Sequence, residues 1–357
     1  CGETPYAELI TQLFRDRMYI ANATGCTSIW RNSSPSTPDT VNSRGQGPAW
    51  DNSLFEDNAE FGYGMLLAQN AIRDGLKAKV EEVMASAEAS EEVKAACKEY
   101  LDTFGIGALN GSATDKLVAA LDGIDCPVCK DIVKNKDFLA KKSQWVFGGD
   151  GWAYDIGFGG VDHVLASGKD INIMVYDTEV YSNTGGQSSK ATKTGAVAQF
   201  AAGGKDVKKK DLAGIAMSYG YVYVAQICMG ADMAQTVKAI SEAEAYPGPS
   251  LIIAYAPCIN HGIKKGMDKA QTEEKLAVEC GYWNNFRYNP AAEKKFSLDS
   301  KAPKLETYQD FLKGEVRYLS LTMKNPDRAA TLFARNEKEA KQRYEHLSKL
   351  VALYGND

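Results

Sequence analysis

Two glycine-rich stretches constrain the fold of this 357-residue chain more than any other feature of its sequence. Residues 147–153 read Phe-Gly-Gly-Asp-Gly-Trp-Ala, and residues 176–187 read Tyr-Asp-Thr-Glu-Val-Tyr-Ser-Asn-Thr-Gly-Gly-Gln. A short apolar strand is predicted directly before each stretch (residues 144–147 and 171–176), and a helix-like segment over residues 152–167 connects them. The interval has about the length of a strand–helix–strand crossover. We therefore expect both stretches at the carboxyl ends of neighbouring parallel strands, where open α/β sheets bind ligands.

The residue types in the two stretches suit a metal-bound diphosphate. Glycines allow backbone N–H groups to approach an anion closely. Asp150 adds one carboxylate and Thr178 adds a hydroxyl, and Mg²⁺ takes oxygen ligands of this kind together with phosphate oxygens. Gly-Asp-Gly alone is a weak signal, because most occurrences are ordinary turns. The crossover spacing and the second stretch make the signal specific.

Together the two stretches resemble the thiamine diphosphate signature, in which Gly-Asp-Gly is followed after one crossover by Asn. Thr178 stands in place of that Asn, which matches one branch, the pyruvate:ferredoxin oxidoreductases. The resemblance implies that Mg²⁺ is bound by Asp150, Thr178 and the backbone carbonyl of Val180. The cofactor-binding residues that it implies are Cys26, Gly148, Gly149, Asp150, Gly151, Trp152, Thr178, Val180, Asn183 and Thr184. Asn183 is also the candidate catalytic residue, hydrogen-bonding the substrate or its adduct, although a turn role is the alternative.

Three cysteines lie in turn-like contexts. Cys1 opens Cys-Gly-Glu-Thr-Pro, Cys26 ends Ala-Thr-Gly-Cys, and Cys258 ends Ala-Pro-Cys. In the family that the chain resembles, cysteines in these contexts hold a [4Fe–4S] cluster, which normally takes four thiolates. The resemblance therefore implies that Cys1, Cys26 and Cys258 are cluster ligands, with the fourth ligand three positions before Cys1. Taken singly, each is more often a structural thiol.

The other five cysteines carry weaker signals. Cys126 and Cys129 form a Cys-x-x-Cys pair, typical of zinc or redox sites, but the sequence has no second pair and no paired His. A metal role for this pair is therefore the less favoured interpretation. We expect Cys97, Cys228 and Cys280 in the core. Eight cysteines without a secretory signal favour a reducing, cytoplasmic compartment.

The predicted fold class is α/β, a mostly parallel sheet with helices on both faces. Further strands are expected over residues 18–23, 220–228 and 249–256, with an edge strand over 282–288. Residues 33–53 are predicted to be irregular. We expect a thiamine diphosphate-binding domain over residues 1–335, including a helical insertion at about 78–142, and a helical C-terminal extension over 336–357.

Bulk composition excludes some classes of partner. A net charge of −5 gives no footprint for nucleic acid, and no apolar run is long enough for a membrane span. Because residue 1 is Cys rather than Met, we expect a fragment of a longer chain, and the resemblance implies the C-terminal part of a larger multidomain enzyme.

The resemblance also implies an activity and its partners. Pyruvate would be oxidatively decarboxylated to acetyl-CoA and CO₂ with coenzyme A, and ferredoxin or flavodoxin would accept the electrons. The expected assembly is a homodimer of anaerobic metabolism whose cofactor-activating Glu lies in a domain outside this sequence. Two alternatives stay open. One is a non-redox decarboxylase or carboligase, which would not need the three cysteines; the other is a non-catalytic cofactor-binding module.

Overall fold

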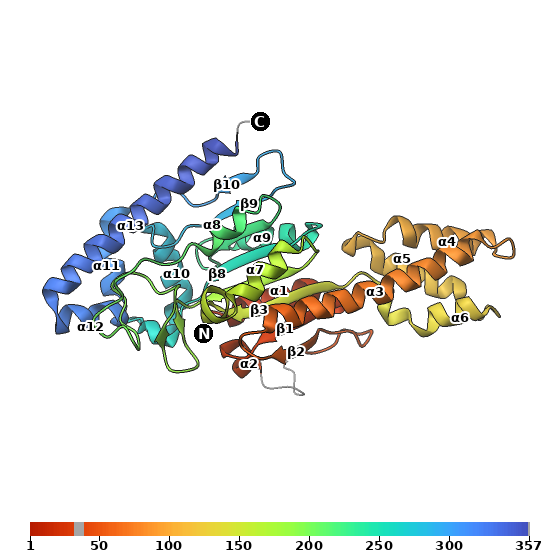
Figure 1. The fold of residues 1–357 in the computed structure, drawn as a ribbon, viewed down its shortest axis with the longest axis horizontal. Coiled ribbons are helices and arrows are strands. Elements are labelled where there is room, and N and C mark those ends of the chain that lie inside the picture. The colour runs from red at the N-terminus through yellow and green to blue at the C-terminus, as the bar shows by residue number, and fades with distance from the viewer. Residues whose placement is uncertain (32–38, 356–357) are drawn as a thin grey trace.

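The computed structural model describes residues 1–31 and 39–355. Within these ranges eight strands form one sheet, with helices on both faces (Figure 1). In sheet order they are β10 (Phe296–Leu298), β9 (Phe286–Tyr288), β7 (Tyr223–Ile227), β8 (Ser250–Tyr255), β4 (Asn172–Asp177), β3 (Ser143–Gly149), β1 (Met18–Ala23) and β2 (Ala49–Ser53). Neighbours from β7 to β2 are parallel, and β9 pairs antiparallel with both β7 and β10. The predicted mostly parallel α/β sheet is confirmed.

Both edges of the sheet differ from the prediction. The sequence predicts an edge strand over residues 282–288, but β9 pairs with β7 on one side and β10 on the other. At the opposite edge, β2 lies within the stretch 33–53 that was predicted to be irregular, of which residues 33–38 lie outside the described residues. The sequence of β2 has no apolar alternation, so its strand conformation depends on pairing with β1.

The predicted crossover connects β3 to β4, which pair in parallel. A π-helical turn, η3 (Gly151–Ile156), and helix α7 (Phe158–Ala166) lie between them. The Trp152 side chain is fully buried, and a Cβ atom at Gly148 or Gly157 would lie 2.3 Å from its ring. Only glycine at these two positions lets the backbone close over the indole. Both glycine-rich stretches therefore reach the same edge of the sheet.

The helices divide between the two faces of the sheet. Helices α1 (Thr4–Phe14) and α9 (Met233–Ala245) share one apolar cluster with Trp145 and Phe147 of β3. The opposite cluster includes Val146 and is covered by α3 (Asn58–Ala85), α7, α8 (Leu212–Met217) and α13 (Pro326–Leu353). β3 serves both layers because successive side chains of a strand point to opposite faces. Near α13 lie α10 (Ala270–Glu279), α11 (Tyr308–Lys313) and α12 (Val316–Lys324) (Figure 1). Among the described residues, no helix is long and apolar enough to cross a membrane.

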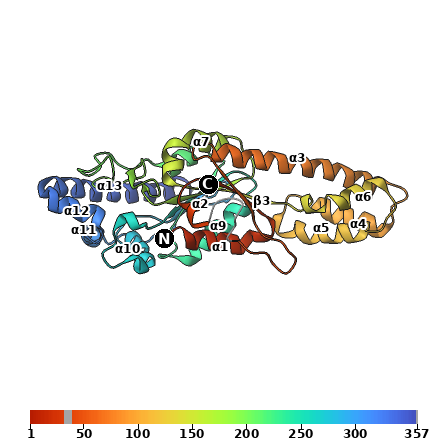
Figure 2. The same cartoon turned by 90° about the horizontal axis from the view of Figure 1, so that it is seen from below.

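A helical arm projects from the sheet body (Figures 1 and 2). It combines the far half of α3 with α4 (Glu91–Asp102), α5 (Gly107–Leu121) and α6 (Pro127–Lys134). Its apolar core is separate from the two sheet clusters. The arm occupies the region of the predicted insertion at about 78–142, although α3 starts within the sheet body. The predicted boundary at 335/336 falls inside α13, whose residues on both sides join one cluster. The division into domains stays a prediction.

A group of buried hydrogen bonds connects helix α1 to the ends of strands β7 and β8. The Tyr6 hydroxyl donates to the Tyr255 carbonyl at 2.9 Å and accepts from the Met229 N–H at 2.8 Å. Glu274 of α10 accepts from the Gly230 N–H at 2.7 Å. Burial raises the pKa of Glu274 to about 8, because a low-dielectric site disfavours the charged form.

We predict that Glu274→Gln makes the free energy of unfolding less dependent on pH. The folded-state pKa is raised from 4.5 to about 8, so the wild type loses stability as pH rises from the unfolded-state pKa through the folded one. Gln keeps an acceptor for the Gly230 N–H and carries no charge. Between about pH 5 and about pH 8.5 the wild type should lose roughly 2 kcal/mol more than the variant, as measured by chemical denaturation.

The control for this prediction is Glu345→Gln, at an exposed position of α13. Its stability should follow the wild-type pH dependence. A Glu274→Gln slope equal to that of the wild type would contradict the prediction.

Candidate functional site

A cavity of about 240 Å³ lies at the carboxyl ends of β1, β3 and β4. Its wall consists of the turn after β1, the Gly-Asp-Gly turn after β3 and the loop after β4, with Glu3 and Phe55 beside them. The structure brings these predicted cofactor-binding residues to the wall: Cys26, Gly149, Asp150, Gly151, Thr178, Val180, Asn183 and Thr184. The cavity therefore lies at the edge where the two glycine-rich stretches were expected to meet.

The three predicted Mg²⁺ ligands form one chain of contacts. The Thr178 hydroxyl is 2.9 Å from Asp150 Oδ1 and 3.1 Å from the Val180 carbonyl oxygen. The Thr178 backbone N–H also donates to Asp150 Oδ1, at 3.2 Å. A carboxylate, a hydroxyl and a carbonyl oxygen form a donor set that suits a hard divalent cation, with positions left for phosphate oxygens. The residues present fit Mg²⁺.

Asp150 is a buried carboxyl that lacks a countercharge in contact. No ion pair reaches it from any residue of the described ranges; its Oδ2 accepts from the Ser189 hydroxyl at 2.5 Å. Burial first, and then the Asp177 carboxyl, raise the pKa of Asp150 to about 8. A bound cation would supply the missing positive charge and favour the ionised form.

A left-handed turn at Glu179 gives the second loop its shape. Its φ of 61° is uncommon for a residue other than glycine. The buried Glu179 carboxylate is 2.9 Å from Arg317 Nη1 and 3.2 Å from Lys209 Nζ, and it accepts from the Tyr282 hydroxyl. Burial alone would raise the pKa of Glu179, but Lys209 and Arg317 together outweigh burial and lower it. These ion pairs hold the strained turn that carries Thr178 and Val180.

His261 joins this loop to the turn that carries Cys258. The buried ring places Nε2 2.7 Å from the Thr178 carbonyl oxygen. Because a carbonyl only accepts, Nε2 carries the proton and Nδ1 is bare. Nδ1 lies 3.7 Å from Glu315 Oε1, and neither atom has a hydrogen-bond partner within residues 1–31 and 39–355. Burial first, and then Arg317, lower the pKa of His261 to about 3, so the ring is neutral at neutral pH.

The turns that carry the three predicted cluster cysteines come together. The Gly2 N–H donates to the Pro257 carbonyl at 2.9 Å, which places Cys1 and Cys258 next to one contact. Burial, then Glu3, then Cys258, raise the pKa of the Cys26 thiol to about 12. In the described part of the chain, no three His, Cys, Asp or Glu side chains are arranged to hold a metal ion. Cluster ligation by Cys1, Cys26 and Cys258 stays a prediction.

Two predicted cofactor-binding residues, Gly148 and Trp152, are not part of the cavity wall. The Trp152 indole is fully buried, and its close contact with Gly148 is the one that closes the turn. Gly151, in contrast, lines the cavity, and a Cβ atom there would lie 2.6 Å from the Tyr181 ring. Gly148 and Trp152 therefore stabilise the Gly-Asp-Gly turn by packing against each other outside the cavity.

The Cys-x-x-Cys pair has a structural place in the helical arm. Cys126 Sγ accepts from the Cys129 N–H at 3.3 Å and so caps α6, and Cys129 is buried in the arm's core. As expected, Cys97, Cys228 and Cys280 are buried.

Sequence reasoning missed several residues of the site. Glu3 is 3% exposed, accepts from Trp30 Nε1 at 2.9 Å, and has its pKa raised to about 7 by burial. Ser189 lies in a stretch with no recognisable motif, and Phe55 comes from a separate segment. Two of these residues had a local signal, because Glu3 lies in Cys-Gly-Glu-Thr-Pro and His261 follows Cys258 by three positions.

We predict that His261→Ala loosens the second loop. Losing the Nε2–Thr178 hydrogen bond should raise amide exchange at Thr178 and Glu179 by about tenfold, because a buried hydrogen bond contributes roughly 1 kcal/mol or more. Hydrogen exchange measured by mass spectrometry or NMR tests this. His261→Gln, which keeps a donor, should restore part of the protection. The matched control is His163→Ala, at an exposed position of α7, and equal exchange in both Ala variants would refute the role.

Comparisons with known proteins show what this chain is similar to. Residues 134–254 match the thiamine pyrophosphate enzyme C-terminal TPP binding domain. The chain is 55% identical over 98% of its length to a pyruvate-flavodoxin oxidoreductase of Klebsiella pneumoniae. It is 56% identical over 98% of its length to a pyruvate:ferredoxin oxidoreductase of Moorella thermoacetica. It spans 30% and 31% of the length of these two relatives.

Among solved structures, a 2-oxoglutarate:ferredoxin oxidoreductase from Magnetococcus marinus is 14% identical, with a TM-score of 0.41 over 74% of this chain and 65% of that one. The assignment rests on the sequence relatives and on the matched domain, which contains both glycine-rich stretches. The chain contains a thiamine pyrophosphate enzyme C-terminal TPP binding domain, and over nearly its whole length it is similar to one part of pyruvate-flavodoxin and pyruvate:ferredoxin oxidoreductases.

Proposed function

We propose that this chain provides the Mg²⁺–thiamine diphosphate site and cluster ligands of an enzyme that oxidises pyruvate, with coenzyme A, to acetyl-CoA and CO₂. Electrons leave through a [4Fe–4S] cluster to ferredoxin or flavodoxin. The observation that carries the proposal is the contact of Asp150 with Thr178, and of Thr178 with Val180, at the cavity. The high identity to proteins named pyruvate-flavodoxin oxidoreductase and pyruvate:ferredoxin oxidoreductase supports the proposal.

The chain's own residues position the cofactor. Asp150, the Thr178 hydroxyl and the Val180 carbonyl would hold Mg²⁺, and the backbone N–H groups of Gly149 and Gly151 would face the diphosphate. When bound, thiamine diphosphate supplies the electron sink that decarboxylation of a 2-oxoacid needs. Because Asp150 is buried, its charge acts on the cation with little screening by water.

Asn183 is the residue that we assign to the substrate. It is exposed in the loop after β4 and lines the cavity beside Thr184. Its side-chain amide can donate and accept, so it suits the carboxylate and carbonyl oxygens of a 2-oxoacid. We assign it to hydrogen-bonding the substrate while the buried part of the loop holds the metal.

Cys26 connects the cofactor cavity to the proposed cluster. It lines the cavity, and its thiol interacts electrostatically with Cys258 and Asp150. A cluster held by Cys1, Cys26 and Cys258 would therefore be adjacent to the cofactor, which suits electron transfer one step at a time.

The rest of the proposal concerns the larger enzyme. We assign the activating Glu and the contacts with coenzyme A to other domains of the same polypeptide, and the fourth cluster ligand to the position three residues before Cys1. A homodimer working in the cytoplasm under anaerobic conditions completes the assignment, which rests on the family relationship.

We predict that Asp150→Ala lowers the Mg²⁺-dependent affinity for thiamine diphosphate by at least about a hundredfold, since removing one partner of a buried charged contact costs several kcal/mol. Isothermal titration with and without Mg²⁺ measures it. Asp102→Ala, at the end of α4 in the helical arm, serves as the control and should bind as the wild type does. Unchanged affinity in Asp150→Ala would show that this carboxylate does not hold the metal.

The redox part of the proposal is tested through Cys26. In the anaerobically purified natural polypeptide, Cys26→Ser should remove the brown visible absorbance and the EPR signal of the reduced cluster, because the cluster loses a thiolate ligand. Pyruvate-dependent reduction of a viologen dye should fall with them. Cys126→Ser, at the helix cap of the arm, should keep all three. A colourless wild-type protein would favour a non-redox decarboxylase instead.

A further inference from the structure

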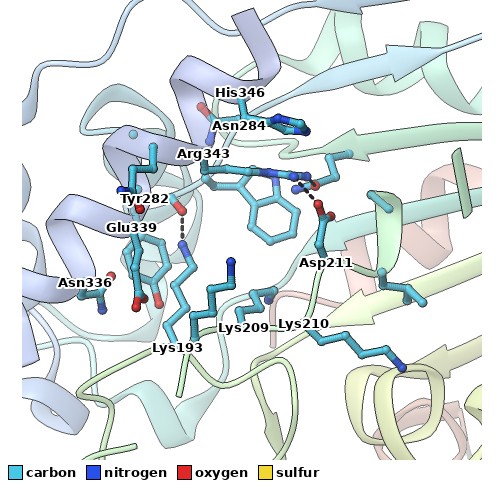
Figure 3. Close-up of a pocket in the computed structure, with 18 of the residues that line it drawn as sticks. Lys193, Lys209, Lys210, Asp211, Tyr282, Asn284, Asn336, Glu339, Arg343 and His346 are labelled. Carbon is cyan, nitrogen blue, oxygen red and sulfur yellow. Dashed lines mark hydrogen bonds and ion pairs between the residues drawn. The ribbon is translucent and has the colours of Figure 1, made fainter. Parts of the chain in front are cut away.

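A second cavity, of about 360 Å³, lies apart from the cofactor site (Figure 3). It lies between residues 208–213, residues 281–284 and helix α13, and none of its lining residues belongs to the first cavity. Its volume falls in the range of small-molecule pockets and well above what a bare ion needs. Neither the matched domain nor the proposed chemistry assigns it a role.

Basic side chains dominate the lining of this cavity. The lining includes Lys193, Lys208, Lys209, Lys210 and Arg343, against two carboxylates, Asp211 and Glu339. Arg343 pairs with Asp211, and Lys209 pairs with Asp177 and Glu179. Figure 3 shows Lys193 and Lys209 extending toward the centre of the cavity, whereas Lys210 extends away from it.

Lys193 extends into the cavity and has N–H donors left for a ligand. Its ammonium donates to the Tyr282 carbonyl and lies 3.6 Å from the centroid of the Tyr282 ring. Within residues 1–31 and 39–355, no carboxylate lies within ion-pair distance of it. An ammonium has three N–H donors, so donors remain for a ligand.

Trp283 adds a neutral donor to the same wall. Trp283 is one of the lining residues; it is 2% exposed, and its buried Nε1 has no hydrogen-bond partner among the described residues. An indole N–H can only donate, and buried donors normally find an acceptor. A positive charge and an unpaired N–H in one cavity both call for acceptor oxygens.

We propose that this cavity binds a small organic anion whose carboxylate or phosphate oxygens accept from the Lys193 ammonium and the Trp283 indole N–H. A cationic ligand is disfavoured by the excess of basic side chains, and an apolar ligand would leave both donors unpaired. The proposal stands whether or not the chain binds thiamine diphosphate. Lys209 lies between this cavity and the second loop and forms ion pairs with Asp177 and Glu179 of that loop.

The test is isothermal titration of the full 357-residue chain with three probes at constant ionic strength: inorganic phosphate, adenosine monophosphate and citrate. At least one should bind with a dissociation constant of about 1 mM or lower. The comparison of citrate with the two phosphates distinguishes carboxylate from phosphate ligands. Lys193→Met and Trp283→Phe should each weaken that binding by about tenfold, since each removes a hydrogen bond to a charged group.

Two further variants separate the site from general charge and folding effects. Lys193→Arg keeps the charge and should keep most of the affinity, and Lys349→Met removes an exposed charge on α13 and should change binding less than about twofold. Circular dichroism checks that each variant is folded. Three results would each overturn the proposal: no binding of any probe, full affinity in Lys193→Met, or equal losses in Lys193→Met and Lys349→Met.

Discussion

The parallel pairing of β3 with β4 is the constraint on which the rest of the site depends. Their register sets Gly149 opposite Tyr176, so the turns that follow the two strands leave the sheet side by side. This pairing brings Asp150 and Thr178 into hydrogen-bond contact although a whole helix separates them in sequence. The glycines keep the turn tight, since a Cβ atom at Gly148 would collide with Trp152.

The buried carboxylates around Thr178 differ in whether a basic side chain compensates their charge. Asp177 and Glu179 flank Thr178, and both would be costly to bury alone. Lys209 compensates both, and Arg317 compensates Glu179 as well. Asp150 lies close by without such a partner, which distinguishes it from its neighbours. An uncompensated carboxyl beside compensated ones marks the position where a cation would be most stabilised.

Hydrogen bonds connect the turn that carries Cys258 to the loop that carries Thr178. The Ala256 N–H donates to the Asp177 carbonyl at 3.0 Å, and His261 donates to the carbonyl of the next residue, Thr178. The Asn260 side chain adds a contact to Ser182 at 3.4 Å. Because of these hydrogen bonds, a shift of the turn that carries Cys258 would also displace the loop that carries Thr178. In the proposed function, this coupling would keep the cluster and the cofactor in a fixed relation.

Local pattern and spacing were enough to predict the α/β class, the crossover and the meeting of Asp150 with Thr178, whereas Cys26, Asn183 and Thr184 came from the family resemblance. Apolar runs and glycine turns act over a few residues, so they can be read from the chain itself. The edge strands could not be predicted, because β2 and β10 depend on a partner strand rather than on their own pattern. Glu3, Ser189 and the His261–Thr178 bond arise from segments far apart in sequence. The basic cavity beside α13 likewise exists only once the helix packs against residues 281–284. Sequence alone determined the chemistry of the two loops, and only tertiary packing decided which buried groups are compensated and which are left to a ligand.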